Sequence, residues 1–277
     1  MNRRDFVQLS SVAAALAASG RLPLLAAPVA KVSRNIFTDP AAIEPVSGAM
    51  RTFIPVSDVF PSGKDREWMY DLVSWEGLQK DGCARNVTSG SLTVRSSGHA
   101  AYTVKQRVGL SGARQDTFLN VELKTDGESG SVRKWAVTSD FAEFNGDKIA
   151  DDSKMELTGQ YDGSVVNLRG AEMRLSYSVE GPLLCPWMLP DLLARMSSDG
   201  RRSLRFTLLD DGLKIRPEQE LSYEGIVQVP VKSGAIPLHI WMQTGRGILP
   251  VHWMLDDAGR TQLMTHSALN WVLKSIA

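Results

Sequence analysis

The sequence is poor in the residues that most often bind metals or carry out nucleophilic chemistry. Of its 277 residues, only two are cysteine and four are histidine. These are dispersed, and none shows the His-x-x-x-His or Cys-x-x-Cys spacing that presents zinc ligands from one element. The nucleophile elbow, the phosphate-binding glycine loop and the dinucleotide fingerprint are also missing. We therefore expect no metal and no cofactor.

An excess of charge of one sign is missing as well. The chain has 31 basic and 31 acidic residues, so its formal net charge is zero. Nucleic-acid-binding domains usually carry a basic surface, so we expect no nucleic-acid partner. Hydrophobic residues make up 43% of the chain and charged residues 22%, which is typical of a globular protein.

The N-terminus has a pattern that indicates export. Arg3 and Arg4 precede a polar residue and two apolar ones, which resembles the twin-arginine export consensus. The Ala- and Leu-rich stretch behind them is too short to span a membrane, as is typical of a signal peptide. We expect residues 1–30 to be this signal, recognised by the twin-arginine export machinery, and the protein to reach the periplasm or cell envelope. The alternative is an ordinary amphipathic helix.

The rest of the chain divides into a short and a long part. Residues 31–65 contain four prolines between Val32 and Lys64 and no sustained period, so we expect an extended lead-in. Residues 66–277 contain no Pro/Gly/Ser-rich linker and no internal repeat. We interpret them as a single β-rich domain.

Alternation of apolar and polar residues dominates this domain, as in strands with one buried face. The clearest case runs from Ala171 to Val179, where we expect the apolar side chains to be buried. Further segments with this pattern bring the total to about a dozen: residues 91–95, 101–108, 119–123, 134–139, 154–159, 204–208, 225–231, 238–243, 251–255 and 269–273.

Short turns join these segments. The Asp-Gly or Asn-Gly pairs at residues 126, 145, 162 and 211 favour tight hairpin turns. Hairpins make neighbouring strands antiparallel, and so many strands in one sheet must curl. We therefore expect a mainly β fold, a large curved antiparallel meander that forms an open barrel or half-barrel.

Two segments have helical features. Pro190 at a plausible first helical position and Gly200 as a stop predict one short helix at residues 190–198. The segment 65–78 is ambiguous, because Trp68, Leu72 and Trp75 have helical spacing.

Three short patterns resemble a group of exported bacterial domains of unknown function. They are Tyr70–Leu78, Gly90–Val94 and Leu249–Arg260, in this order along the chain. The resemblance covers residues 66–275. It implies a curved antiparallel sheet similar to periplasmic lipid carriers, with no catalytic residues. It also favours a strand over a helix for residues 68–75.

The two cysteines, Cys83 and Cys185, have alternative interpretations. An oxidising compartment would permit a disulfide between them. They can also be unpaired thiols that pack as small apolar residues. The spacing does not decide between these, because disulfide geometry depends on the fold.

Tryptophan and methionine are the least ordinary feature, with seven and ten residues. Core packing is the default explanation. Trp241 and Met254, however, are out of phase with their apolar neighbours, which indicates late strands that are apolar on both faces. Together with Trp187 and Met188 before the predicted helix, they are our candidate ligand-binding residues.

Three functions follow from these observations. The first is non-enzymatic binding of a lipid or other apolar or amphiphilic ligand in the curved sheet. The second is an envelope hydrolase whose residues, such as His99, His252 or Asp257, converge only in the folded protein. The third is a structural or assembly module that meets a protein partner through exposed strand edges.

Overall fold

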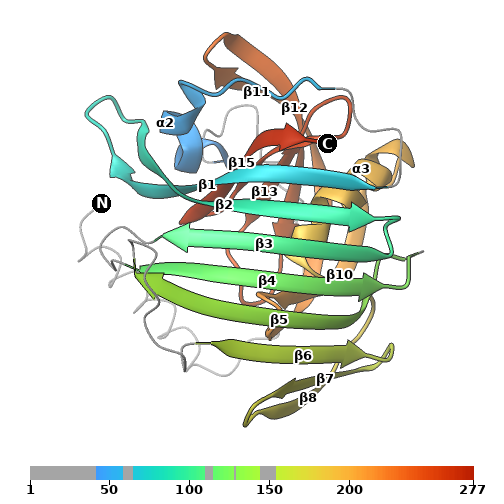
Figure 1. The fold of residues 1–277 in the computed structure, drawn as a ribbon. Coiled ribbons are helices and arrows are strands. Elements are labelled where there is room, and N and C mark those ends of the chain that lie inside the picture. Colours follow the sequence, from blue (N-terminus) through green and yellow to red (C-terminus); the bar gives the residue numbers. More distant parts are fainter. Residues whose placement is uncertain (1–41, 59–64, 110–114, 128, 144–153) are drawn as a thin grey trace, which may run out of the picture. The chain divides into compact units, whose positions relative to one another are not determined.

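The computed structural model describes residues 42–58, 65–109, 115–127, 129–143 and 154–277. The signal segment, including Arg3 and Arg4, lies outside these ranges, as does the turn predicted at residue 145. The described strands form one curved, unclosed sheet of 15 strands that is almost entirely antiparallel (Figure 1). The predicted open meander is confirmed.

The strands fall into two series along the chain. The first comprises β1 (Arg66–Leu78), β2 (Ala84–Ser97), β3 (Ala101–Gly109), β4 (Gln115–Thr125), β5 (Val132–Glu143), β6 (Met155–Tyr161), β7 (Val165–Gly170) and β8 (Arg174–Ser178). The second comprises β9 (Leu183–Leu184), β10 (Ser203–Asp210), β11 (Lys214–Val231), β12 (Gly234–Thr244), β13 (Val251–Leu255), β14 (Thr261–Thr265) and β15 (Leu269–Ile276).

The two series meet where the first strand of the domain, β1, pairs with the last, β15. The strand order of the sheet is β8-β7-β6-β5-β4-β3-β2-β1-β15-β14-β13-β12-β11-β10-β9. The first and last strands, β1 and β15, are therefore neighbours, and β8 and β9 form the two edges although they are adjacent in sequence. We call the gap between these edges the seam.

Local sequence signals explain much of this meander. At the β10–β11 turn, Asp211 and Gly212 both have positive φ, of 53° and 70°. A type I′ hairpin requires this conformation, which Asp tolerates and Gly adopts without cost. Trp68 and Trp75 both lie in β1, so the expected strand over residues 68–75 is confirmed.

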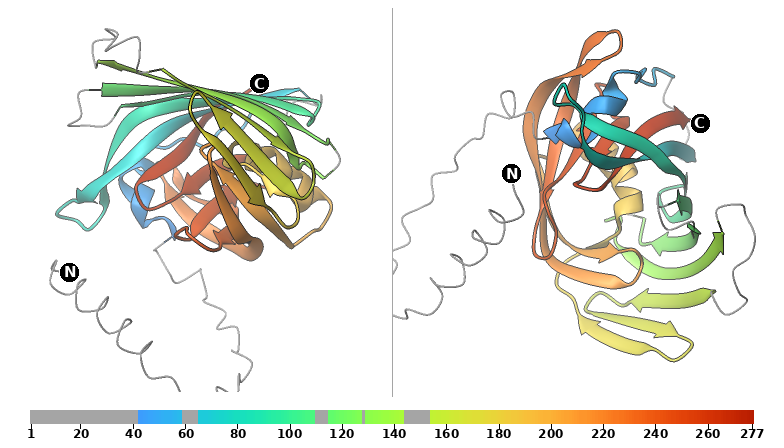
Figure 2. Two further views of the ribbon diagram at one scale, coloured as in Figure 1. Left: turned by 90° about the horizontal axis from the view of Figure 1, so that it is seen from below. Right: turned by 90° about the vertical axis from the view of Figure 1, so that its left-hand side faces the viewer.

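Within the described ranges, one helix covers the inner, concave face of the sheet. The turn η5 (Pro186–Met188) leads into α3 (Leu189–Ser198), which confirms the predicted helix. Leu189, Leu192, Leu193 and Met196 are buried and belong to the main hydrophobic core. Figure 2 shows α3 inside the curve, between the first series of strands and β10–β13.

The outer face of the late strands is covered by the lead-in. Its described part contains two short helical turns, η3 (Glu44–Val46) and α2 (Ser47–Met50), and is thus not simply extended. Val46, Met50 and Phe53 form a second core with residues of β11–β14. Because these helices have only three and four residues, they leave no helical period in the sequence by which they could be predicted. Among the described helices, none is long and apolar enough to span a membrane.

One strand differs from its expected burial. The segment Ala171–Val179 was expected to bury one apolar face, yet all five residues of β8 are exposed. Leu175 and Tyr177 are paired with Leu168 and Val166 of β7, which are buried. The expectation holds for Val179, which is 6% exposed, and fails for Leu175 and Tyr177, because β8 is an edge strand that no other element covers.

Candidate functional site

An apolar cavity opens on the inner face near the start of α3. Its volume is about 520 Å³, within the usual range for small-molecule sites. Three tryptophans line it, Trp187 from η5, Trp253 from β13 and Trp271 from β15. Other apolar side chains in the lining are Leu208, Ile248, Leu249, Val251, Met264 and Leu269. We call this space the tryptophan cavity.

Strand register brings the aromatic side chains together. Met264 of β14 is paired with Trp253 on one side and with Trp271 on the other. Because directly paired residues share a face of the sheet, all three side chains lie on the inner face. The rings of Trp253 and Trp271 meet edge to face, with centroids 5.5 Å apart.

Two of the indole N–H groups donate hydrogen bonds within the protein. Trp253 Nε1 donates to Gln243 Oε1 at 3.2 Å, and Trp187 Nε1 donates to Gln106 Oε1 at 3.4 Å. The glutamines thereby hold these two rings in place. What the rings offer to a ligand is mainly their apolar surface.

The cavity also has a polar side. Arg216 Nε donates to Asp210 Oδ2 at 2.7 Å, and its guanidinium donates further to the carbonyl of Gly247. His266 is half-buried here, and burial lowers the pKa of its imidazole below the ordinary 6.5, although Asp210 opposes this shift. The Arg216–Asp210 ion pair and the carboxylate of Asp211 supply the charges of this side.

Leu249 is the most exposed large apolar residue of the cavity lining. Its exposed fraction is 58%. It lies in the connection between β12 and β13, next to Ile248 and Pro250. An apolar side chain held at the mouth of an apolar cavity is available to contact a bound molecule.

The four predicted ligand-binding residues do not form one site. Trp187 lines the tryptophan cavity, whereas Met188 and Trp241 are fully buried in the inner core and are not part of its lining. Met254 lies in the outer core, where the lead-in covers it. The prediction that the late strands are apolar on both faces is confirmed, and this two-sidedness separates Met254 from the other three.

Sequence reasoning missed Trp253, Trp271 and Leu249 as parts of a site. Both tryptophans fall within segments of alternating pattern, 251–255 and 269–273, which predict strands but no site. Their convergence depends on the β13–β14–β15 register, which alternation within each strand does not contain. The exposed Leu249 follows a glycine-rich turn and gave no periodic signal.

The two cysteines are free thiols. Cys83 is half-buried in the β1–β2 connection, and Cys185 is completely buried directly before η5. Burial raises the pKa of the Cys185 thiol well above its ordinary value. Cys185 thus follows the alternative of an unpaired thiol that packs in the core, and the possible disulfide is not formed.

One histidine, an acid and a tyrosine meet beneath α3. The carboxylate of Asp191 accepts hydrogen bonds from His99 Nδ1 at 2.6 Å and from Tyr102 Oη at 2.7 Å. Burial, followed by the charge of Asp191, raises the pKa of the Tyr102 hydroxyl. This hydroxyl therefore stays protonated, which suits a structural contact better than a nucleophile.

A second histidine lies in a separate hydrogen-bonded chain. His239 Nδ1 is 2.9 Å from Tyr223 Oη, and His239 Nε2 is 2.9 Å from Asp257 Oδ1. The side chain of Asp257 is 80% exposed. The structure thus places His99 and Asp257, both named in the hydrolase alternative, in different clusters. His252 lies on β13, paired with Met242 and Thr265.

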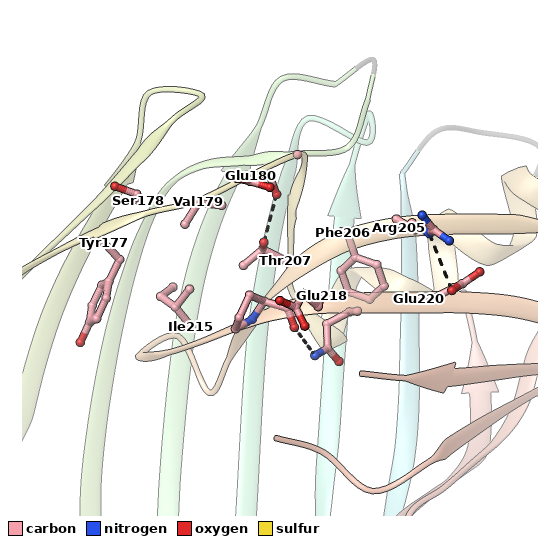
Figure 3. Close-up of a pocket in the computed structure, with 13 residues that line it drawn as sticks. Tyr177, Ser178, Val179, Glu180, Arg205, Phe206, Thr207, Ile215, Glu218 and Glu220 are labelled. Atoms are coloured by element: carbon pink, nitrogen blue, oxygen red, sulfur yellow. Dashed lines mark hydrogen bonds and ion pairs between the residues drawn. The ribbon is translucent and has the colours of Figure 1, made fainter. Parts of the chain in front are cut away.

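A further cleft lies along the seam, and Figure 3 shows it in close-up. Its volume is about 860 Å³. One side is formed by the end of β8 and the following connection, from Tyr177 to Gly181. The other side is formed by Arg205–Thr207 of β10 and by Ile215 and Pro217–Glu220 of β11. We call it the seam cleft.

The described part of the chain contains no group of three or more His, Cys, Asp or Glu residues arranged to hold a metal ion.

No protein-family model matches this chain, and no curated protein matches it. Solved structures with a similar fold include a beta-barrel-like protein of the domain of unknown function DUF1849 from Brucella abortus. It is 12% identical with a TM-score of 0.49, over 76% of this chain and 96% of that one. Another is a DUF1089 family protein from Pseudomonas aeruginosa, also 12% identical, with a TM-score of 0.39 over 68% and 93% of the two chains.

Proposed function

We propose that this protein binds an apolar or amphiphilic small molecule in the tryptophan cavity, without transforming it. The observation that carries the proposal is a cavity of about 520 Å³ lined by three tryptophans, with the exposed Leu249 in its lining. Apolar surface removed from water contributes roughly 25 cal/mol per Å², so a molecule that covers these side chains gains affinity.

The polar side of the cavity favours an amphiphile over a pure hydrocarbon. The Arg216–Asp210 ion pair lies beside the apolar lining. A ligand with a polar group at one end can place this group at the ion pair and its apolar part against the indoles. Typical small-molecule sites combine a mainly apolar lining with a few polar groups in this way.

The proposed location is the periplasm or cell envelope. Arg3 and Arg4 support it through their resemblance to the twin-arginine consensus. The export machinery that reads this signal is then a transient partner. Membrane lipids of the envelope are a source of amphiphiles for such a protein.

A matched pair of leucine substitutions tests the proposal. Leu249 and Leu78 are both 58% exposed, but only Leu249 lines the cavity. The fluorescent fatty acid cis-parinaric acid is titrated into the full-length protein, and energy transfer from tryptophan reports binding. Leu249→Glu is expected to weaken binding about tenfold or more, or about 1.4 kcal/mol, because it puts a charge against the apolar part of the ligand.

Leu78→Glu is the control and is expected to bind as the wild type does. Equal affinity of the three proteins would place the fatty acid outside the cavity and contradict the proposal. Native mass spectrometry of the wild-type protein purified from its own envelope reports any bound lipid. If the wild type binds neither cis-parinaric acid nor any such lipid, the proposed function is rejected.

A further inference from the structure

The edge strand β8 has an unpaired side. Among the described strands, it pairs only with β7. Proteins commonly protect such edges with Lys, Pro or a bulge, because a free edge is a template for another strand. The β8 sequence, Arg-Leu-Ser-Tyr-Ser, contains neither Lys nor Pro, and Arg174 at its start is its only charged residue. The edge is thus open to pairing.

The register identifies the backbone groups that face this side. Gly170 N donates to Met173 O, and Val179 N donates to Ser164 O, both at 2.8 Å, at the two ends of the β7–β8 pair. Antiparallel pairs alternate between bonded and non-bonded positions. Leu175 and Tyr177 therefore bond to β7, whereas the N–H and C=O groups of Arg174, Ser176 and Ser178 point to the free side.

Apolar side chains accompany these free backbone groups. Leu175 and Tyr177 are each 38% exposed. They lie on the same face of the sheet as their β7 partners Leu168 and Val166, which are buried. Across the seam cleft lie Phe206 of β10 and Ile215 of β11. Figure 3 shows Tyr177 on one side of the cleft and Ile215 on the other. The cleft thus offers apolar contacts next to the edge.

The charge of the cleft is negative. It contains Glu180, Glu218 and Glu220, and a single cation, Arg205. Arg205 lies 3.7 Å from Glu220, and no ion pair of Glu180 or Glu218 is found among the described residues. Complementary charge selects and orients binding partners, so this cleft favours a cationic one.

The backbone at Glu218 is strained, with a φ of 57° that favours glycine. The buried side chain of Gln219 maintains this conformation, because its Nε2 donates to the carbonyls of Pro217 at 2.9 Å and Arg246 at 3.1 Å. Strain that the surroundings hold in place often accompanies a functional site. Here it keeps an exposed carboxylate on the wall of the cleft.

We infer that the seam is a docking site for an extended, basic segment of a protein partner, which adds a strand to the free side of β8. The segment pairs with the backbone of Arg174, Ser176 and Ser178. Its apolar side chains contact Leu175 and Tyr177, and its Lys or Arg side chains face Glu180 and Glu218. This is recognition by strand addition, in which the backbone gives affinity and the side chains give specificity.

Two peptides and two backbone variants test this site. A fluorescein-labelled heptapeptide of alternating Lys and Val is titrated into the full-length protein and followed by fluorescence anisotropy. A peptide with Glu in place of Lys is the control. The Lys peptide is expected to bind more tightly, with an advantage that shrinks as salt is raised because salt screens charges.

Ser176→Pro removes the N–H that points to the free side and keeps the bonds to β7, because proline is tolerated on an edge strand. It is expected to weaken binding of the Lys peptide about tenfold, the effect of one lost backbone hydrogen bond. Ser176→Ala keeps the N–H and is expected to bind as the wild type does. Glu218→Gln is expected to weaken binding of the Lys peptide only and to reduce its salt dependence.

Several outcomes would overturn the inference. These are equal binding of the two peptides, no binding of either, or unchanged affinity after both Ser176→Pro and Glu218→Gln. A dimer of the free protein that Ser176→Pro dissociates, seen by analytical ultracentrifugation, would assign the edge to a second copy instead. Leu249→Glu is expected to leave peptide affinity unchanged, which separates this site from the tryptophan cavity. If Ser176→Pro does not fold, the Glu218→Gln result alone decides.

Discussion

Asp191 is a charged residue that is completely enclosed in the fold. Its carboxylate accepts hydrogen bonds from His99 and Tyr102, and Arg66 Nη1 lies 3.3 Å away. These partners come from β1, from β3 and from the turn before β3, so one side chain connects α3 to the first strands of the sheet. Asp191 also lies in the first turn of α3, where the helix dipole favours a negative charge.

Asp191→Ala is expected to reduce the free energy of unfolding by about 3–5 kcal/mol, because it leaves buried partners without their counter-charge. Urea denaturation followed by circular dichroism measures the loss. Asp199→Ala, an exposed position at the end of the same helix, is the control and is expected to change stability by less than about 0.5 kcal/mol. A loss of similar size in both variants would show that Asp191 is not the connection described.

At the scale of elements, the short helix α2 contributes a buried side chain to the outer core. Met50, at its end, is 2% exposed and contacts the outer core of the late strands. The lead-in also forms a hydrogen bond with the sheet, because Gln262 Nε2 of β14 donates to the carbonyl of Val56 at 2.7 Å. This segment therefore completes the outer face of β13 and β14.

Met50→Ala is expected to destabilise the protein by about 2–5 kcal/mol, through lost burial and the cavity it creates. Ile54→Ala removes a side chain that is 70% exposed, four residues further on, and is expected to stay within about 0.5 kcal/mol of the wild type. Thermal unfolding of both variants distinguishes them. Equal midpoints would mean that the lead-in does not contribute to the folded core.

Three described strands, β7, β9 and β14, were not predicted from the sequence, and β14 shows one reason. All five residues of β14, from Thr261 to Thr265, are buried. The inner face of this strand meets the tryptophan cavity and its outer face meets the lead-in, so it has no wet side. Alternation detects strands that have one wet face, and β14 gave no such signal. β8 shows the opposite case, alternation without burial.

At the scale of the whole molecule, the first and last strands, β1 and β15, pair in the middle of the sheet. The edge strands β8 and β9, which border the seam, lie at its two ends. The β1–β15 pair joins residues near 68 and 276, so this contact forms only when nearly the whole domain has been made. Sheets with such distant pairings fold slowly compared with helical proteins.

Replacing Arg3 and Arg4 together by Lys is expected to keep the protein in the cytoplasm. Lysine keeps the charge but lacks the planar guanidinium, so the exchange is not conservative where arginine is recognised. Immunoblots of periplasmic and cytoplasmic fractions report the result. Arg21→Lys, in the same segment, serves as the control and is expected to be exported. Unchanged export of the Lys-Lys variant would refute the twin-arginine assignment.

The sequence by itself determined the class of fold, through signals that act over a few residues. Alternation predicted most strands, Asp211-Gly212 predicted a tight turn, and Pro190 with Gly200 predicted α3, because backbone preferences at these positions are local. The pair Asp126-Gly127 instead begins a longer connection, between Thr125 and Val132. Only the tertiary structure decided which strands pair at the ends of the sheet and which face each tryptophan occupies. It also decided that Trp187, Trp253 and Trp271 share a cavity while Met254 lies behind it, because register and curvature depend on contacts between residues far apart in the chain.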